Sequence, residues 1–299
     1  MPAKQKITAI TGLLSGAAVW GMVWYPFRVL EEAAISGMLS SFLVYAIALV
    51  AGLAVSGPVW RELRTAGWWA VLLLFSAGWT NFGYVAAIIE GEVMRVLLLF
   101  FLSPLWTVLF SRVLLGEKLN RVGVGVMALS LGGAVVMLWR PDGEWPLPTN
   151  RAEWLALSAG VAFALSNVIS RHLAGVADGA RSVSIWLGVL LLTLAGLVAV
   201  PGDLGFVAGA GGSVWLLLVG VGLAIGSVTY AVQYGLARVP ANQAIVIFLF
   251  ELVVAAVASY FLAHEHMDRQ EWVGALMIVT ASLFSGHMED AQRKETADA

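Results

Sequence analysis

The chain has no cysteine and little charge. With no cysteine among its 299 residues, disulfides and thiolate metal sites are excluded. Charged residues make up 12% of the chain, whereas soluble globular domains carry about 25%. The formal net charge is −2, so no basic surface indicates nucleic acid as a partner. These absences argue against a soluble or nucleic-acid-binding protein.

What the chain does have is long apolar runs. Hydrophobic residues make up 60% of it, and about 20 apolar residues in a helix cross a hydrocarbon core of roughly 30 Å. A helix is required because backbone groups in lipid find hydrogen-bond partners only within the segment. The sequence therefore predicts an all-α integral membrane protein. Its ten transmembrane helices are expected near residues 7–29, 36–56, 68–89, 93–115, 122–139, 152–172, 182–200, 213–236, 242–263 and 272–287.

Basic residues are distributed unevenly over the predicted loops. If the N-terminus is inside, twelve of the 17 lysines and arginines fall on the inner side and five on the outer side. Cytoplasmic loops carry the excess of these residues in membrane proteins. We therefore expect a multi-pass protein of a bacterial-type cytoplasmic (inner) membrane, with both termini in the cytoplasm.

Two stretches of the chain repeat each other. The turn GEKLNR, between the fourth and fifth spans, corresponds to HEHMDR, between the ninth and tenth. Glu117 thus aligns with Glu265 and Arg121 with Arg269, both 148 positions apart. The first and sixth spans also correspond, with Trp20 over Phe163 at a spacing of 143.

The repeat predicts two five-helix halves in opposite orientations. An odd number of spans in each half places the second upside down relative to the first, and inverted repeats hold a binding site near the bilayer midplane between them. We expect a first five-helix repeat at 1–140, a linker loop at 141–150, a second repeat at 151–288 and a disordered cytoplasmic tail at 289–299.

Three features resemble a known family. They are Pro104 in SPLWTVLF, the turn Gly116-Glu117 that follows it, and the glycine-rich fifth span. The chain resembles the EamA type of the drug/metabolite transporter superfamily, which implies ten helices as five plus five and a transport function. The segment GEVMRVLLLFFLSPLWTVLFSRVLLGEK looks most like the YddG-like aromatic amino acid exporters. The second half departs from the pattern, with Leu252 at the position that corresponds to Pro104.

Two charged side chains inside spans are candidates for function. Of the 19 acidic residues, only Glu251 falls near the middle of a span, where a carboxylate costs about 2.5–3.5 kcal/mol. Glu251 is expected either to sense a proton or substrate charge, or to be a neutral carboxyl bonded to a neighbouring helix. Arg95, near the outer end of the fourth span, either attracts a substrate carboxylate or extends to the headgroups.

Amides and aromatic residues extend this candidate site. The related segments WTNFGY and TYAVQY lie in the third and eighth spans, and such side chains either hold helices together or line a pore. Most tryptophans lie near span ends, as in interfacial belts. Pro26 and Pro104 are candidate hinges or static kinks. Between spans 1, 3, 4, 6, 8 and 9 we expect a substrate cavity lined by Trp20, Trp24, Trp79, Asn81, Tyr84, Arg95, Trp106, Asn167, Tyr230, Gln233, Tyr234, Gln243 and Glu251.

Enzyme chemistry finds little support in the sequence. The four histidines lie at span ends, and all lysines are terminal or in loops. The chain contains no P-loop and no G-x-S-x-G. We therefore expect no catalytic residue, no cofactor and no resident metal.

The sequence as a whole predicts a secondary transporter that exports small amphipathic metabolites by alternating access. Aromatic amino acids are the first guess, by resemblance. The alternatives are a nucleotide-sugar or sugar-phosphate exchanger and, in a different class, a membrane-embedded enzyme or sensor. The expected partners are a small-molecule substrate and membrane lipid; the sequence does not determine the oligomeric state and is compatible with a monomer.

Overall fold

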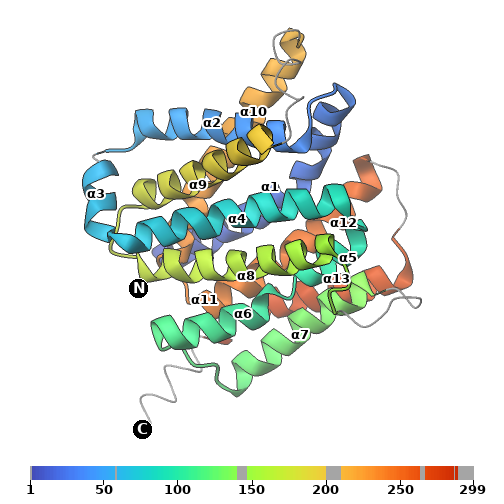
Figure 1. Ribbon diagram of the computed structural model, residues 1–299. Coiled ribbons are helices and arrows are strands. Elements are labelled where there is room, and N and C mark those ends of the chain that lie inside the picture. The colour runs from blue at the N-terminus through green and yellow to red at the C-terminus, as the bar shows by residue number, and fades with distance from the viewer. Residues whose placement is uncertain are drawn as a thin grey trace.

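The computed structural model describes residues 2–57, 59–139, 147–199, 210–262, 267–285 and 287–288, and these form helices and no strands (Figure 1). The tail 289–299 and most of the linker lie outside these ranges. The elements are α1 (Ala3–Glu32), α2 (Gly37–Val55), α3 (Val59–Ala66), α4 (Trp68–Glu90), α5 (Val93–Phe100), α6 (Ser103–Phe110), the π-helical turn η1 (Ser111–Leu115), α7 (Arg121–Leu138), α8 (Arg151–His172), α9 (Asp178–Ala199), α10 (Gly212–Leu236), α11 (Ala241–Phe248), α12 (Phe250–Leu262) and α13 (Arg269–Phe284).

The all-helical membrane class is confirmed. Nine helical segments of the described chain are long and apolar enough to span a bilayer, with α5, α6 and η1 forming one segment and α11 and α12 another. The tenth expected span is α13, which has only 16 residues and packs along α7. Helix α3 is a short amphipathic helix between the second and third spans, and no helix was expected there from the sequence.

The last helix of each half begins with the same kind of cap. The Asn120 side chain accepts a hydrogen bond from the backbone N–H of Gly123 (2.7 Å), and α7 starts at the next residue. The Asp268 carboxylate accepts one from the N–H of Glu271 (2.8 Å) at the start of α13. These side chains satisfy N–H groups that have no partner within the helix. The two caps lie 148 positions apart, which is also the spacing between the sequence segments GEKLNR and HEHMDR.

Both halves contain one interrupted span. Phe101 and Leu102 separate α5 from α6, and Leu249 separates α11 from α12. Pro104 lies in the first turn of α6, where its missing N–H costs nothing. Leu249 is 148 positions after Phe101, yet no proline follows it in the first turn of α12. The interruption therefore occurs in both halves, although only the first carries the proline.

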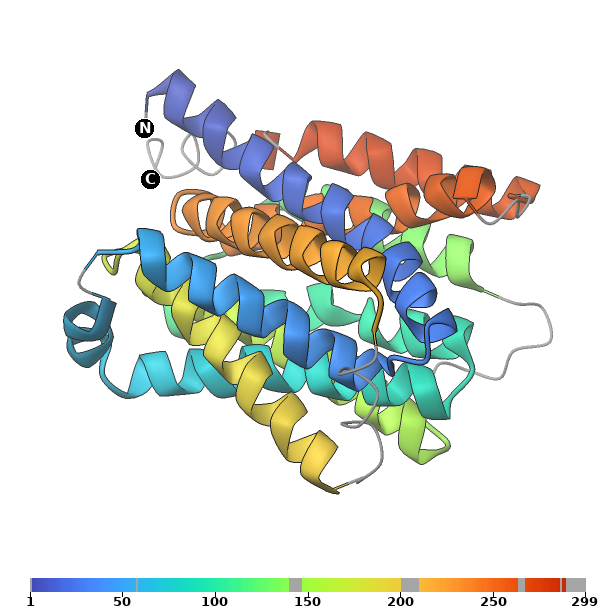
Figure 2. The same ribbon diagram turned by 90° about the horizontal axis from the view of Figure 1, so that it is seen from above.

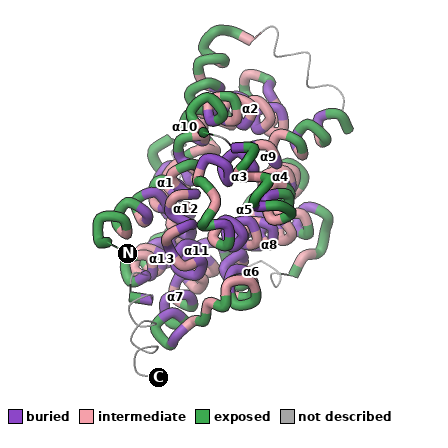
Figure 3. Tube along the Cα trace, turned by 90° about the vertical axis from the view of Figure 1, so that its left-hand side faces the viewer, coloured by how far each residue is buried: buried purple, intermediate pink, exposed green. Residues whose placement is uncertain are grey.

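The helices of the two halves pack on each other in a reciprocal pattern. The third span, α4, packs along α8 and α9, the first two spans of the second half. The eighth span, α10, packs in the same way along α1 and α2. The second spans α2 and α9 contact each other, as do the fifth spans α7 and α13. Figures 1 and 2 show these neighbours side by side, and buried residues concentrate on their inward faces (Figure 3).

Glycines permit the closest of these approaches. A Cβ atom on Gly133 of α7 would lie 2.8 Å from the carbonyl oxygen of Gly274 in α13 and 2.9 Å from the Cβ of Met277. Gly125, on the same helix, has no atom within 4 Å of its Cβ position. Small residues at such contacts allow backbones to meet in membrane bundles.

These two glycines give a matched test of the α7–α13 contact. Gly133→Ala should destabilise the protein by about 1–3 kcal/mol, since the added methyl group forces the two backbones apart. Gly125→Ala should be neutral or stabilising by up to about 1 kcal/mol, because alanine favours the helix and meets no neighbour. Thermal unfolding of the two variants in detergent measures the difference, and equal midpoints would contradict the close contact.

Candidate functional site

A row of aromatic rings crosses the bundle beside the two interrupted spans. Trp20 of α1 meets Phe248 of α11 edge-on, with ring centroids 6.1 Å apart. Phe248 is 5.8 Å from Phe163 of α8, which is 5.4 Å from Phe100 of α5. Tyr84 of α4 ends the row, 4.9 Å from Phe100. These distances are typical of favourable ring pairs. We call these five residues the aromatic row.

Four residues of the row form two pairs at the spacings of the expected repeat. Trp20 and Phe163 are the pair that aligns at a spacing of 143, and Phe100 and Phe248 align at 148. Phe100 is the last residue of α5 and Phe248 the last of α11, so each precedes an interruption. The prediction included Trp20 and Tyr84 but missed the three phenylalanines. The repeat spacing, applied to phenylalanine as well as to polar residues, would have found them.

Two glycines bring the first span of each half against these interruptions. A Cβ atom on Gly160 of α8 would lie 2.5 Å from the carbonyl oxygen of Phe100. On Gly21 of α1 it would lie 2.7 Å from the carbonyl oxygen of Glu251. Helices α1 and α8 therefore cross the interrupted spans at backbone distance, which holds the aromatic row in place from both sides.

Glu251 lies next to this crossing. It is in the first turn of α12, directly after the interruption at Leu249. Its chain neighbours Leu249 and Leu252 belong to the same buried cluster as Phe100, and Tyr84 packs against that cluster. Among the described residues, no basic side chain lies within ion-pair distance of Glu251. The one carboxylate in the middle of a span is thus placed beside the row without a cation of the protein to neutralise it.

Several predicted site residues carry buried polar atoms with no protein partner in the described chain. Most buried polar groups in proteins are hydrogen-bonded, and an unpaired one costs about 1–3 kcal/mol. Each such donor or acceptor would gain a hydrogen bond from a water or a polar solute that reached it. These atoms are Trp24 Nε1, Asn81 Oδ1, Trp106 Nε1, Asn167 Nδ2 and both amide atoms of Gln243.

Other predicted residues are engaged by the protein itself. The Trp79 indole donates to the Ser158 hydroxyl (3.0 Å) between α4 and α8. Arg95 pairs with Glu153 (3.2 Å) at the start of α8, so a substrate carboxylate would have to compete with that ion pair.

The predicted residues of α10 lie toward one end of that helix. The Gln233 side-chain oxygen accepts from Arg181 (3.4 Å). The ring of Tyr234 lies under the Arg238 guanidinium, 3.5 Å from it, and Tyr230 is 44% exposed. Of the candidate hinges, Pro26 lies inside the continuous α1, whereas Pro104 adjoins the interruption between α5 and α6.

A polar cluster joins the two halves at the end of the bundle where α1 begins, which we call the N-terminal face. The Glu117 carboxylate accepts hydrogen bonds from the backbone N–H of Ala241 (3.0 Å) and the side chain of Asn242 (3.5 Å) at the start of α11. Arg171 lies 3.8 Å from the same carboxylate and donates to the Ala237 carbonyl. Ser111 donates to Asn242 (3.2 Å). Glu117, in the family-like turn that follows η1, thus contacts two later helices, α8 through Arg171 and α11 through Ala241 and Asn242.

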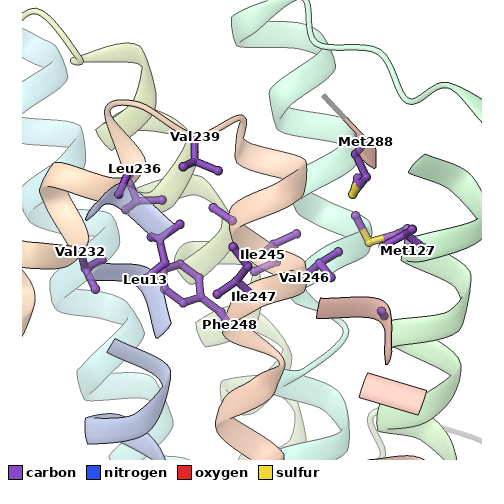
Figure 4. Close-up of a cluster of buried hydrophobic side chains, with 14 residues drawn as sticks. Leu13, Met127, Val232, Leu236, Val239, Ile245, Val246, Ile247, Phe248 and Met288 are labelled. Atoms are coloured by element: carbon purple, nitrogen blue, oxygen red, sulfur yellow. The ribbon is translucent and has the colours of Figure 1, made fainter. Parts of the chain in front are cut away.

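Apolar packing lies between this polar cluster and the aromatic row. Leu13 of α1, Val232 and Leu236 of α10 and Ile245 of α11 are all buried in one cluster that also contains Phe248 (Figure 4). The N-terminal face is therefore closed by an apolar layer with a polar cluster outside it.

Among the described residues, the opposite end of the bundle has no corresponding polar cluster. Arg28, which aligns with Arg171, places its guanidinium over the Trp24 ring at 5.1 Å, within α1 itself. Glu265, which aligns with Glu117, lies outside the described residues. Arg171 thus bridges between elements, whereas Arg28 makes a contact within its own helix.

Comparisons with known proteins agree with this fold. Residues 150–286 match the EamA-like transporter family. The chain is 24% identical to the riboflavin transporter of Rhizobium johnstonii over 72% of this chain and 68% of that protein. It is 26% identical to protein RarD of Streptomyces exfoliatus over 91% of this chain and 86% of the relative. A solved crystal structure with 21% identity shares the fold, with a TM-score of 0.73 over 95% of this chain and 98% of the other.

The polar cluster has a testable dependence on pH. Burial raises the pKa of Glu117 above its ordinary value, and this outweighs the opposing effects of the Ala241 N–H and of Arg171. A carboxyl whose pKa is raised on folding stabilises the protein most below its unfolded pKa, and this contribution is lost as the pH rises through the folded pKa. The stability of the wild type relative to Glu117→Gln should therefore be greater at pH 5 than at pH 8.

Thermal unfolding of the two proteins across that range provides the measurement. Glu32→Gln makes the same charge change at an exposed position of α1 and controls for the other carboxyls. If the difference in unfolding midpoint between the wild type and Glu117→Gln does not vary with pH, the burial of this carboxyl is contradicted.

Proposed function

We propose that this chain, whose residues 150–286 match the EamA-like transporter family, is a member of the EamA type of the drug/metabolite transporter superfamily and a secondary transporter that exports small amphipathic metabolites, aromatic amino acids first. The observation that carries this proposal is the aromatic row with its neighbouring unpartnered polar atoms. Flat faces and edges of aromatic side chains favour flat aromatic solutes. Ligand sites that are mostly apolar use a small number of polar groups at fixed positions to orient the ligand, and buried indole and amide groups can supply these.

The charges near the row favour an amino acid over a phosphate. Glu251 is suited to an ammonium group, because among the described residues it has no basic partner within ion-pair distance. Trp24, Trp106 and Asn167 each offer an unpartnered N–H to a carboxylate. A nucleotide sugar or sugar phosphate would need several cations at this depth. Arg95, the arginine expected in the fourth span to attract an anionic substrate, is already paired with Glu153.

A flavin is the second candidate substrate. The relative from Rhizobium johnstonii is named a riboflavin transporter, and the isoalloxazine ring is also flat and aromatic. Without an ammonium group, a flavin would not depend on Glu251. Competition between the two kinds of solute therefore distinguishes them.

Alternating access is proposed from the arrangement of the halves. The reciprocal contacts of α4 with α8 and α9, and of α10 with α1 and α2, are what two inverted repeats would produce. Rocking of one half against the other would separate Glu117 from Ala241 and Arg171, which belong to the second half. We propose that this contact opens and closes the N-terminal face during each cycle. The excess of basic residues on that face supports a cytoplasmic position for it.

Flux into proteoliposomes tests the function and the row together. Labelled phenylalanine or tryptophan should enter liposomes that contain the protein, and unlabelled aromatic amino acids should compete more strongly than riboflavin or sugar phosphates. Phe163→Ala removes the central ring of the row and should reduce this flux at least tenfold. A tenfold reduction corresponds to a loss of about 1.4 kcal/mol in the interaction with the solute.

Phe75→Ala is the matched control, since Phe75 lies on α4 with 54% of its surface exposed. Equal flux through the two variants would refute the role of the row. Absence of flux for every solute tested would favour a membrane-embedded enzyme or sensor instead.

Glu251 gives a separate prediction. Glu251→Gln keeps the shape of the side chain and removes its charge and its proton exchange, so transport of an amino acid should fall and lose its dependence on pH. Initial rates from pH 5 to pH 8, with and without a pH gradient, measure this. Normal transport with the wild-type pH profile would show that Glu251 senses neither proton nor substrate charge.

A further inference from the structure

A groove opens on the outside of the bundle between α3, α4 and α9. It has a volume of about 370 Å³. Its apolar walls are formed by Leu63 of α3, Val71 and Leu74 of α4, and Leu187 of α9. The groove exists because α3 turns into α4 at Gly67, which has a φ of +59° and no atom within 4 Å of its Cβ position.

The groove faces lipid along its length. Both α4 and α9 are long and apolar enough to span a bilayer, and Val71 is 53% exposed. Trp60 and Trp68 at the α3 end are 58% and 61% exposed. Indole rings at the ends of spans lie at the level of the headgroups. The apolar part of the groove therefore extends from the headgroup level into the hydrocarbon region.

The headgroup end of the groove is positively charged. Arg64 lines the groove, and Arg61 lies three residues before it, on the same side of α3. Both are exposed, and among the described residues neither makes an ion pair. The acidic residue of the same helix, Glu62, is directed to the backbone N–H of Ala177 (3.4 Å). Among the described residues, Glu62 therefore forms no ion pair with either arginine.

We propose that this groove binds one anionic phospholipid, with an acyl chain between Leu63, Leu74 and Leu187 and the phosphate at Arg64. The apolar walls select a lipid over a soluble anion. The unpaired arginines select an anionic over a zwitterionic headgroup, since each basic residue near a membrane surface contributes about a fivefold preference for anionic lipid. The site is independent of the transport cavity, because α3 takes no part in the aromatic row.

Native mass spectrometry of the full-length protein in detergent, titrated with phosphatidylglycerol or phosphatidylcholine, tests this site. The wild type should retain the first phosphatidylglycerol at least fivefold more tightly than phosphatidylcholine. Arg64→Gln should remove that preference. Arg112→Gln should preserve it, because Arg112 is an exposed arginine on the same face, in η1 and away from the groove.

A second variant probes the acyl chain. Val71→Trp fills the groove from its exposed side and should lower retention of both lipids, with the arginines intact. Equal losses from Arg64→Gln and Arg112→Gln would overturn the site in favour of diffuse attraction. Retention unchanged by Val71→Trp would also overturn it, as would displacement of phosphatidylglycerol by inorganic phosphate. All of these measurements concern lipid retention and none concerns flux. A result that overturns the lipid site therefore leaves the transport proposal unaffected.

Discussion

Backbone hydrogen bonding in a medium without water is the constraint on which this structure depends. In hydrocarbon, each N–H and C=O must find a partner within the protein, which is why the long apolar runs are helical. The two interruptions respect the same constraint. The N–H of Phe101 still donates to Leu97 (2.9 Å), and that of Leu249 to Ile245 (3.2 Å). Each break is therefore a change of direction in a largely bonded backbone, and it is covered by a helix of the other half.

The interruptions also explain where the candidate site lies. A span that changes direction at its centre ends one helix there and begins another, so side chains can converge from both. Phe100 and Phe248 end α5 and α11, and Glu251 lies in the first turn of α12. Gly21 and Gly160 let α1 and α8 approach these points. Aromatic rings from four helices, with one carboxylate a few residues beyond them in the chain, thus lie at the two interruptions.

Among the described residues, Arg28 and Arg171 make different contacts at the two ends of the bundle, although they align in the sequence. At the N-terminal face, Glu117 and Arg171 belong to different halves and hold α11 in place. Arg28, which aligns with Arg171, instead stacks on Trp24 within α1. In the proposed cycle, one arrangement would be stabilised by the contact at Glu117 and the other would lack it, and the two exchange readily only if their energies are similar. The asymmetry is the structural basis for the proposed closure at Glu117.

The sequence by itself determined the membrane class and the positions of the spans within a few residues, because hydrophobic length and periodicity are local properties. It also placed Trp20, Tyr84 and Glu251 among the candidates. The break at Leu249 and the three phenylalanines of the aromatic row were decided only by the tertiary structure. An interruption without proline has no local signal, and a phenylalanine inside an apolar run looks the same whether it faces lipid or another ring. Only the packing of α1 and α8 against the broken spans distinguishes the two.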